Sequence, residues 1–165
     1  MADVCRALAL SGGANNGAWE AGVMWGLLHY GDPEDFAWQV ISGISAGSIN
    51  TAASSVWKVG DEYAMTEWLS DEWANLTSST VWTYWGDGPA ADIFGHAGVV
   101  NNAPLKQFIA DTVDSFPEGI QRAFFIQADD ANTGLNVTFS NDNTDINLLP
   151  TAATASGSVP VAFPP

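Results

Sequence analysis

Short apolar runs alternate with longer helical patterns over the first sixty residues, and this alternation restricts the fold more than any other feature of the sequence. Apolar runs at residues 6–10 and 38–41 predict two buried strands, and the segments that follow them, residues 17–30 and 46–59, have helical spacing. A strand, a helix, a strand and a helix in this order predict a βαβ unit, in which a right-handed crossover joins two parallel strands. We therefore expect an α/β fold.

The rest of the chain continues as part of the same domain, because 165 residues is the length of one domain and no repeat or linker interrupts the sequence. Residues 61–73 and 104–113 predict amphipathic helices. Two apolar segments, residues 122–128 and 135–140, flank a turn rich in Asp, Asn and Gly and predict a β-hairpin. Residues 147–156 predict a short helix.

The first predicted helix has two candidate contact faces. One face is large and apolar and consists of Trp19, Val23, Leu27 and Tyr30. The other is a row of small residues at intervals of four, namely Ala18, Gly22 and Gly26. Because glycine inside a helix costs ~1 kcal/mol relative to alanine, we expect this row to pack closely against the sheet.

A glycine-flanked serine lies where the second predicted strand meets the second predicted helix. Residues 43–47 read Gly-Ile-Ser-Ala-Gly, the GxSxG pattern in which a sharp turn lifts a serine hydroxyl off the sheet edge. Gly43 and Gly47 would leave room for such a turn, and the helix that follows would direct backbone N–H groups and a positive dipole toward Ser45. Ser45 is therefore the candidate nucleophile; the alternative is a strand-to-helix turn with an incidental serine.

A glycine loop at residues 11–17, Ser-Gly-Gly-Ala-Asn-Asn-Gly, ends the first predicted strand. Parallel strands joined by one crossover place this loop and the serine turn at the same sheet edge, where open α/β sheets hold their sites. Backbone N–H groups beside a nucleophilic serine can form an oxyanion hole, in which one donor contributes ~2.7–4 kcal/mol in the transition state. Phosphate-binding motifs do not fit, because a dinucleotide fingerprint needs glycine at Ala14 and a P-loop needs lysine after Gly17.

Together the two motifs resemble the patatin-like phospholipase family, in which a Gly-Gly-Gly-x-Arg/Lys-Gly loop precedes GxSxG at about this distance. The resemblance extends to the strand and helix around the glycine loop and to the turn Asp-Ala-Asn-Thr-Gly at residues 130–134. Residues 155–160 and Phe163-Pro164 look like the segment that leads to the family's catalytic aspartate. The resemblance covers nearly the whole chain and implies a three-layer α/β/α fold with a mainly parallel central sheet.

The resemblance also implies a lipid acyl hydrolase of the phospholipase A type, which uses a Ser–Asp dyad without histidine. Ser45 corresponds to the nucleophile that attacks the ester carbonyl, and Gly12, Gly13 and Ala14 correspond to the oxyanion loop. An aspartate would act as the general base, and water would hydrolyse the covalent acyl-enzyme. The substrate would be a lipid or another acyl ester, and no metal or cofactor is expected.

The sequence departs from the family pattern in three ways. Ala14 replaces the third glycine, and we expect alanine to be tolerated there only if its φ is negative. Asn16 replaces the basic residue of the loop. No Asp-Gly-Gly or Asp-Gly-Ala sequence occurs before the chain ends at Pro165. We therefore expect residues 1–165 to be a single patatin-like domain that is truncated before the catalytic-Asp segment, with a remaining segment or subunit supplying the aspartate.

The same departures motivate a second hypothesis, in which the chain is a catalytically inactive patatin-like subunit with a binding or structural assembly role. An α/β domain that binds a small acidic or acylated ligand is the residual hypothesis. A Ser–His–Asp triad is a further alternative, which would combine Ser45 with His96 and with Asp87 or Asp92. His96 lies in a glycine-rich stretch away from the predicted strand ends, so an exposed loop histidine is the simpler interpretation.

The chain carries 4 basic and 19 acidic side chains, a formal net charge of −15. So few cations cannot neutralise a run of phosphates, which excludes nucleic acid as a partner. Polybasic attraction to anionic lipid is missing for the same reason. Contact with a membrane or micelle would therefore be apolar. The candidate for such contact is the cluster of Trp82, Tyr84 and Trp85, for which core packing or an oligomer contact is the alternative.

The sequence does not indicate a compartment. It contains no visible signal peptide or transmembrane segment, and the sequons at Asn75 and Asn136 are compatible with a secreted or lumenal location. The one cysteine, Cys5, lies in an apolar run and is expected to be buried and inert. Asp129 and Asp130 lie at a strand-to-turn junction and are expected to cap the turn rather than to act as a base or to bind metal.

Overall fold

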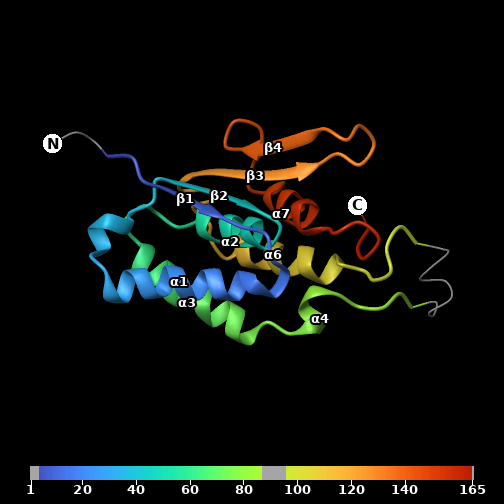
Figure 1. Ribbon diagram of the computed structural model, residues 1–165, viewed down its shortest axis with the longest axis horizontal. Coiled ribbons are helices and arrows are strands. Elements are labelled where there is room, and N and C mark those ends of the chain that lie inside the picture. Colours follow the sequence, from blue (N-terminus) through green and yellow to red (C-terminus); the bar gives the residue numbers. More distant parts are fainter. Residues whose placement is uncertain (1–3, 87–95, 165) are drawn as a thin grey trace.

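The computed structural model describes residues 4–86 and 96–164, in which four strands form one sheet. The strands are, in chain order and in sheet order, β1 (Ala7–Leu10), β2 (Val40–Ile44), β3 (Ala123–Asp129) and β4 (Asn136–Ser140). β1, β2 and β3 are parallel, and β4 pairs antiparallel with β3. The expected βαβ unit, the mainly parallel sheet and the hairpin are confirmed (Figure 1).

The helices connect the strands in the order that the sequence predicts. They are η1 (Ala14–Asn16), α1 (Gly17–Tyr30), η2 (Pro33–Phe36), α2 (Ala46–Ser55), α3 (Glu62–Asn75), α4 (Ser78–Val81), α6 (Ala103–Asp114) and α7 (Leu149–Gly157), of which η1 and η2 are short 3-10 turns. α1 joins β1 to β2, and α2 begins directly after β2. None of the described helices is long and apolar enough to span a bilayer.

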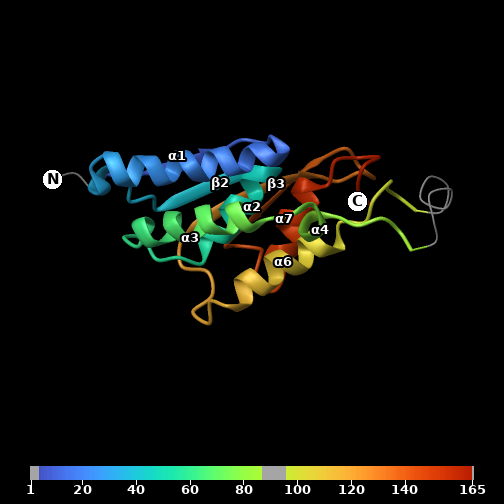
Figure 2. The same cartoon turned by 90° about the horizontal axis from the view of Figure 1, so that it is seen from below.

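The fold is of the three-layer α/β/α-like type. Along β3, Phe124 and Ile126 are fully buried, whereas Phe125 between them is 43% exposed, so helices cover one face of the sheet. α2 and α7 lie directly against this face, and α1 and α3 lie further from it (Figures 1 and 2). The described residues thus supply two layers of this fold type, the sheet and the helices that cover one of its faces.

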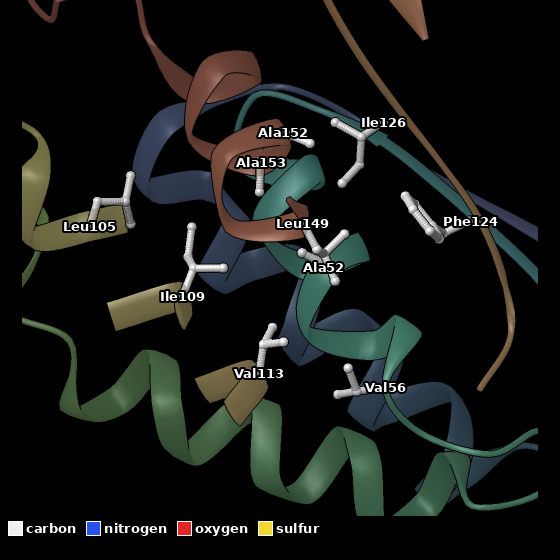
Figure 3. Packing of buried hydrophobic residues seen from close by; sticks show 10 residues of the cluster. All are labelled: Ala52, Val56, Leu105, Ile109, Val113, Phe124, Ile126, Leu149, Ala152 and Ala153. Atoms are coloured by element: carbon white, nitrogen blue, oxygen red, sulfur yellow. The ribbon is translucent and has the colours of Figure 1, made fainter. Parts of the chain in front are cut away.

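Two hydrophobic clusters fill the space between the helices and the sheet. The cluster between α2, α6, α7 and β3 consists of Ala52, Val56, Leu105, Ile109, Val113, Phe124, Ile126, Leu149, Ala152 and Ala153 (Figure 3). The cluster that joins α1 and α3 to β1 and β2 consists of Leu10, Ala21, Met24, Leu28, Trp38, Ile41, Ala53, Met65 and Leu69. α2 contributes to both clusters, so packing on both of its flanks fixes its position.

The expected packing face of α1 is wrong. The buried residues of α1 are Gly17, Ala21, Met24 and Leu28. Trp19 and Tyr30 are instead 71% and 85% exposed. A Cβ added at Gly22 or Gly26 would meet no atom within 4 Å, so the row of small residues makes no close contact with the sheet. Apolar residues occur on all sides of α1, and for this reason its spacing did not distinguish the buried side.

Three smaller expectations also differ from the structure. β2 extends past the predicted segment, because its parallel pairing with β3 continues as far as Ile44. α2 ends at Ser55, before the predicted end, and the Ser55 carbonyl accepts hydrogen bonds from the N–H groups of Gln121 and Arg122. Cys5 is exposed rather than buried, because it precedes the first residue of β1.

A buried ion pair lies at the end of the sheet where the parallel strands begin. Arg122 Nη1 lies 2.9 Å from Glu62 Oε1, and the two side chains are 0% and 3% exposed. The guanidinium also donates hydrogen bonds to the carbonyls of Trp38, Trp57 and Lys58. Burial lowers the pKa of Arg122, and the Glu62 carboxylate opposes that shift. Arg122 therefore links the end of α2, the start of α3 and the start of β3.

Candidate active site

Ser45 lies in the sharp turn between β2 and α2, at the carboxyl end of the parallel strands. Its backbone has φ 55° and ψ −122°, a conformation that costs a non-glycine residue about 1–3 kcal/mol. A Cβ added at Gly43 would overlap the carbonyl group of Gly47, and a Cβ added at Gly47 would lie 2.6 Å from the carbonyl oxygen of Leu10. Backbone contacts therefore require both glycines of the motif.

Hydrogen bonds from three directions hold the backbone of this turn. The Ser45 N–H donates to Ser156 Oγ over 2.8 Å. The carbonyl of Ser45 accepts a hydrogen bond of 2.5 Å from Ser48 Oγ. The N–H of Gly47 donates to the carbonyl of Ser11 over 3.1 Å, which joins the turn to the glycine loop. Ser45 is partly exposed, and its hydroxyl forms no hydrogen bond with any described residue.

The glycine loop passes directly beside Ser45. A Cβ added at Gly12 would lie 3.0 Å from Ser45 Cβ and 3.6 Å from Ser45 Oγ, so a side chain at Gly12 would crowd the hydroxyl. No described residue accepts a hydrogen bond from the amides of Gly12, Gly13 or Ala14. The predicted nucleophile and the predicted oxyanion loop are thus adjacent in space, with unpaired donors in the loop.

The backbone at Ala14 contradicts the expectation of a negative φ. Ala14 has φ 51°, in the left-handed region that favours glycine, and this conformation costs an L-residue about 1–2 kcal/mol. The loop turns there into η1, where the N–H of Asn16 donates to the carbonyl of Gly13 over 2.9 Å. A small cavity of about 420 Å³ lies beside this loop and is lined by Ser11, Gly12, Asn16, Trp19 and Glu20.

A larger cavity of about 600 Å³ opens at Ser45. Its walls come from α2, α3, α4 and α6 and are mostly apolar; they include Ile49, Trp68, Leu69, Leu76, Val81 and Leu105. Ala14 and Phe163 line the same cavity. Clefts of this volume that combine apolar walls with a few polar groups are typical of small-ligand sites. The site therefore consists of a partly exposed serine at the edge of an apolar cavity.

A few polar residues also line this cavity, and Glu72 of α3 is the described lining residue that carries a carboxylate. No hydrogen bond links the Glu72 carboxylate to Ser45 in the described part of the chain. Asn15, Thr77 and Ser78 are exposed and add hydrogen-bonding groups to the cavity wall.

The alternative Ser–His–Asp triad gains no support from the described residues. Asp87 and Asp92 lie outside them. His96 is not among the residues that line the cavity with Ser45; its ring stacks on Trp85, with 3.9 Å between the ring centroids. The other described histidine, His29, binds the Glu67 carboxylate at the far end of α1, with 2.7 Å between His29 Nε2 and Glu67 Oε1.

The three aromatic residues proposed to contact lipid have different surroundings. Trp82 lines the large cavity. Tyr84 is 70% exposed and packs edge-to-face on Trp82. Trp85 is partly buried and donates a hydrogen bond of 2.9 Å to the carbonyl of Gly98. Tyr84 is therefore the member of the cluster that is most open to a surface.

The two aspartates at the end of β3 serve the hairpin turn. The Asp130 carboxylate accepts hydrogen bonds of 2.9 Å from the N–H of Asn132 and from Thr133 Oγ1, and these bonds hold the pKa of Asp130 below its usual value. Asp129 accepts a longer hydrogen bond from Asn136. The expected capping role is confirmed for Asp130. The described residues contain no group of three or more His, Cys, Asp or Glu side chains that could hold a metal ion.

Sequence reasoning did not find Ser156, whose hydroxyl bridges the serine turn and β3. Besides accepting from the Ser45 N–H, Ser156 Oγ donates a hydrogen bond of 2.6 Å to the carbonyl of Gln127. In the sequence, residues 155–160 resemble the segment that leads to the family's catalytic aspartate, and no local pattern indicates that Ser156 reaches back to the turn.

Comparisons with known proteins agree with this architecture. The family model described as patatin-like phospholipase matches residues 8–165. The crystal structure of the type III effector protein ExoU is similar, with a TM-score of 0.54 and 17% sequence identity over 96% of this chain. The similar region is 39% of the ExoU chain, so this chain spans well under half the length of that protein. No curated protein matches the sequence.

Proposed function

Because the chain belongs to the patatin-like phospholipase family, we propose that it is a lipid acyl hydrolase that cleaves ester bonds in the manner of a phospholipase A. One observation carries this proposal: Ser45 occupies a strained turn between unpaired loop amides and an apolar cavity of about 600 Å³. That combination offers a nucleophile, hydrogen-bond donors for an oxyanion and a compartment for a hydrocarbon chain.

Ser45 is the proposed nucleophile. Its Oγ would attack the ester carbonyl carbon while a base removes the hydroxyl proton, giving a tetrahedral oxyanion. The collapse of this intermediate would release the alcohol, which takes up a proton, and leave the acyl group on Ser45. Water would then attack the acyl-enzyme and release the fatty acid. α2 begins directly after Ser45, so the positive end of its dipole favours the developing negative charge.

The oxyanion would be bound by the amides of Gly12, Gly13 and Ala14. These amides have no acceptor among the described residues, and Gly12 lies so near Ser45 that an added Cβ would be 3.6 Å from Ser45 Oγ. A preorganised donor of this kind contributes ~2.7–4 kcal/mol to the transition state. The side-chain amide of Asn16 replaces the loop cation of the family pattern, so the oxyanion would depend on backbone donors more than on a nearby positive charge.

The family resemblance implies an aspartate as the general base. The chain contains no Asp-Gly-Gly or Asp-Gly-Ala sequence. We therefore propose that a segment or subunit outside these 165 residues supplies the aspartate. Phe163 lines the cavity together with Ser45, so the segment that the resemblance places before the aspartate reaches the proposed site.

The proposed substrate is a lipid whose acyl chain enters the large cavity. Its apolar walls would take a hydrocarbon chain out of water, which gains ~0.8 kcal/mol for each buried methylene group. Contact with a lipid surface would be apolar, because the net charge of −15 repels anionic headgroups. Tyr84, which is 70% exposed, would contribute to that contact.

The second candidate function is an inactive patatin-like subunit that binds lipid or assembles with a partner. The left-handed backbone at Ala14 and the loss of the loop cation at Asn16 favour it, because both change the loop proposed to bind the oxyanion. In this case the cavity would still bind an acyl chain, but Ser45 would not catalyse ester hydrolysis.

Two measurements on the full-length protein test the proposal. We expect it to hydrolyse chromogenic acyl esters, and Ser45→Ala to abolish this activity and the labelling by a fluorophosphonate probe. Ser54→Ala is the matched control, since Ser54 is fully buried on the same helix and its hydroxyl has no partner. Equal hydrolysis by wild type and Ser45→Ala would refute the serine mechanism. Fatty-acid binding without labelling of Ser45 would favour the inactive subunit.

A further inference from the structure

A buried asparagine, Asn50 of α2, connects three elements around the glycine loop. Its Nδ2 donates to the carbonyl of Gly17 over 3.0 Å and to Glu20 Oε2 over 3.2 Å. Its Oδ1 accepts a hydrogen bond of 2.7 Å from Trp73 Nε1. Asn50 is 0% exposed, so water cannot replace these partners.

The chemistry of the partners fixes the orientation of the Asn50 amide. The indole nitrogen of Trp73 can only donate, so the Asn50 oxygen must face it. The Gly17 carbonyl and the Glu20 carboxylate oxygens accept hydrogen bonds from the Asn50 nitrogen, so the nitrogen must face them. A primary amide of this length satisfies all three partners, and neither a carboxylate nor an aliphatic side chain of the same size can do so.

Glu20 carries the connection on to the loop. Its Oε1 accepts a hydrogen bond of 2.6 Å from the N–H of Ser11, the residue that directly precedes Gly12. The loop from Ser11 to Gly17 is therefore held at both ends: at its start through Glu20, and at its end through the bond from Asn50 to the Gly17 carbonyl. The Ser11 N–H is thus paired with Glu20, whereas the amides of Gly12, Gly13 and Ala14 have no acceptor among the described residues.

Trp73 connects the same network to the large cavity. Its ring lies so close to Gly17 that a Cβ added there would be 2.6 Å from Trp73 Cζ2. Trp73 also lines the cavity that opens at Ser45. One indole thus contacts the proposed acyl compartment, packs against the end of the glycine loop and binds Asn50.

We propose that Asn50 is a positioning residue that, through Glu20 and Trp73, fixes the glycine loop beside Ser45 and joins it to the wall of the acyl cavity. This inference rests on the proposed function, because the loop has a catalytic role only if Ser45 is acylated. Asn50 does not itself touch the reacting atoms. Its effect is therefore on the geometry of the donors, and misplacement by 1 Å can lower a rate by about 10²-fold.

The variants that test this proposal change the hydrogen bonds and preserve the shapes. Asn50→Asp is isosteric but directs a second carboxylate at Glu20 and at the Gly17 carbonyl. Trp73→Phe keeps an aromatic ring over Gly17 and removes the donor to Asn50. Trp25→Phe is the matched control, because it likewise removes one indole hydrogen bond. This bond, from Trp25 Nε1 to Glu67 over 2.8 Å, joins α1 to α3 away from the site.

The first readout is kinetic and uses the full-length protein. We expect Asn50→Asp and Trp73→Phe to lower kcat for ester hydrolysis by about 10-fold to 100-fold, and Trp25→Phe to leave kcat and KM unchanged. Asn50 does not line the cavity, so KM should change less than about twofold in Asn50→Asp. Rates are expressed per site titrated with a fluorophosphonate, so that a loss of folded protein does not count. A kcat per titrated site equal to that of wild type in both variants would overturn the proposal.

The second readout does not depend on activity and separates this proposal from the proposed function. Amide hydrogen exchange of Ser11, followed by NMR, reports directly on its bond to Glu20. We expect exchange at Ser11 to accelerate at least about tenfold in Trp73→Phe and to remain unchanged in Trp25→Phe. Unchanged exchange at Ser11 would refute the positioning role even in an active enzyme, whereas accelerated exchange in a protein without esterase activity would refute the hydrolase and retain the network.

Discussion

The hydroxyl of Ser156 accepts a 2.8 Å hydrogen bond from the backbone N–H of Ser45, although 111 residues separate the two serines in the sequence. The same hydroxyl donates to the carbonyl of Gln127 at the carboxyl end of β3. α7 thus supports the strained turn from the side opposite to the glycine loop. The geometry of Ser45 therefore depends on the docking of α7 against the sheet.

Ser156→Ala should destabilise the protein and disturb the turn. It leaves a backbone N–H without an acceptor, which costs about 1–3 kcal/mol when the group is buried, and Ser45 is partly buried. Urea unfolding measures the loss of stability, and the rate of fluorophosphonate labelling measures the reactivity of Ser45. Ser158→Ala is the control, since it removes hydrogen bonds to Asn102 and Thr154 but none to Ser45. Equal labelling rates in both variants would show that Ser156 has no role in the turn.

Alanine at Gly47 should destabilise the protein by about 3 kcal/mol or more, because its Cβ would lie 2.6 Å from the carbonyl oxygen of Leu10 and 2.7 Å from that of Ser11. The same change at Gly22 is the control. A Cβ there meets no atom within 4 Å, so Gly22→Ala should stabilise α1 by up to about 1 kcal/mol through helix propensity. Chemical denaturation compares the two variants. Similar free energies of unfolding for both would contradict the close backbone approach at Gly47.

Ala14→Gly should stabilise the fold. The left-handed φ of 51° at Ala14 costs an L-residue about 1–2 kcal/mol, whereas the greater freedom of glycine in the unfolded chain costs about 0.5–1 kcal/mol. The net gain is about 0.5 kcal/mol, measured as a rise in Tm. Ala110→Gly within α6 should instead lower the stability by about 1 kcal/mol. A fall in Tm for Ala14→Gly would show that its backbone is not strained.

The order and pairing of the helices and strands could be predicted from the sequence, whereas the buried side of α1 could not. The order of strands and helices and the parallel pairing follow from local periodicity and from the handedness of crossovers. The buried side of α1 did not follow, because Trp19 and Tyr30 are as apolar as the residues that pack inside. Burial there depends on where α3 lies, which no local pattern encodes.

In the candidate site, too, residues of local motifs were predicted and residues with distant partners were not. Ser45, Gly12 and Gly47 were predicted because a tight turn and a close backbone approach require particular residue types in a fixed local order. Ser156 and Asn50 were not predicted, because their partners lie 111 and 33 residues away in the sequence. A lone serine or asparagine in a small-residue helix carries no sign of such a long-range hydrogen bond.

Arg122→Met should destabilise the protein by about 3–5 kcal/mol, because it leaves the Glu62 carboxylate buried without a partner. Replacing both residues, as Arg122→Met with Glu62→Leu, should recover much of this loss, since a buried ion pair can be exchanged for apolar packing. Urea unfolding of the two single variants and the double variant gives the coupling energy. Additive effects in this cycle would mean that the two side chains do not interact. Because the pair lies at the opposite end of the strands from Ser45, fluorophosphonate labelling of the folded fraction should not change.

The length of the acyl chain that the cavity accepts should depend on Ala53. This residue is 7% exposed and lines the cavity about 12 Å along α2 from Ser45. In the wild-type protein, kcat/KM should rise by about fourfold for each methylene added to the acyl chain until the cavity is filled, because each buried methylene gains ~0.8 kcal/mol. Ala53→Leu fills the far end of the cavity. It should lower kcat/KM for long-chain esters by at least about tenfold and leave that for acetyl esters within about twofold.

Ala74→Leu provides the control for this change, since Ala74 is exposed on α3 and does not line the cavity. A series of nitrophenyl esters of increasing acyl length, assayed with the full-length protein, gives both profiles. If Ala53→Leu lowers kcat/KM equally for short and long esters, the acyl chain does not run along α2. A loss confined to the long esters would identify the space between α2, α3 and α6 as the acyl compartment, because Ala53 lies too far along α2 to act on the ester group itself.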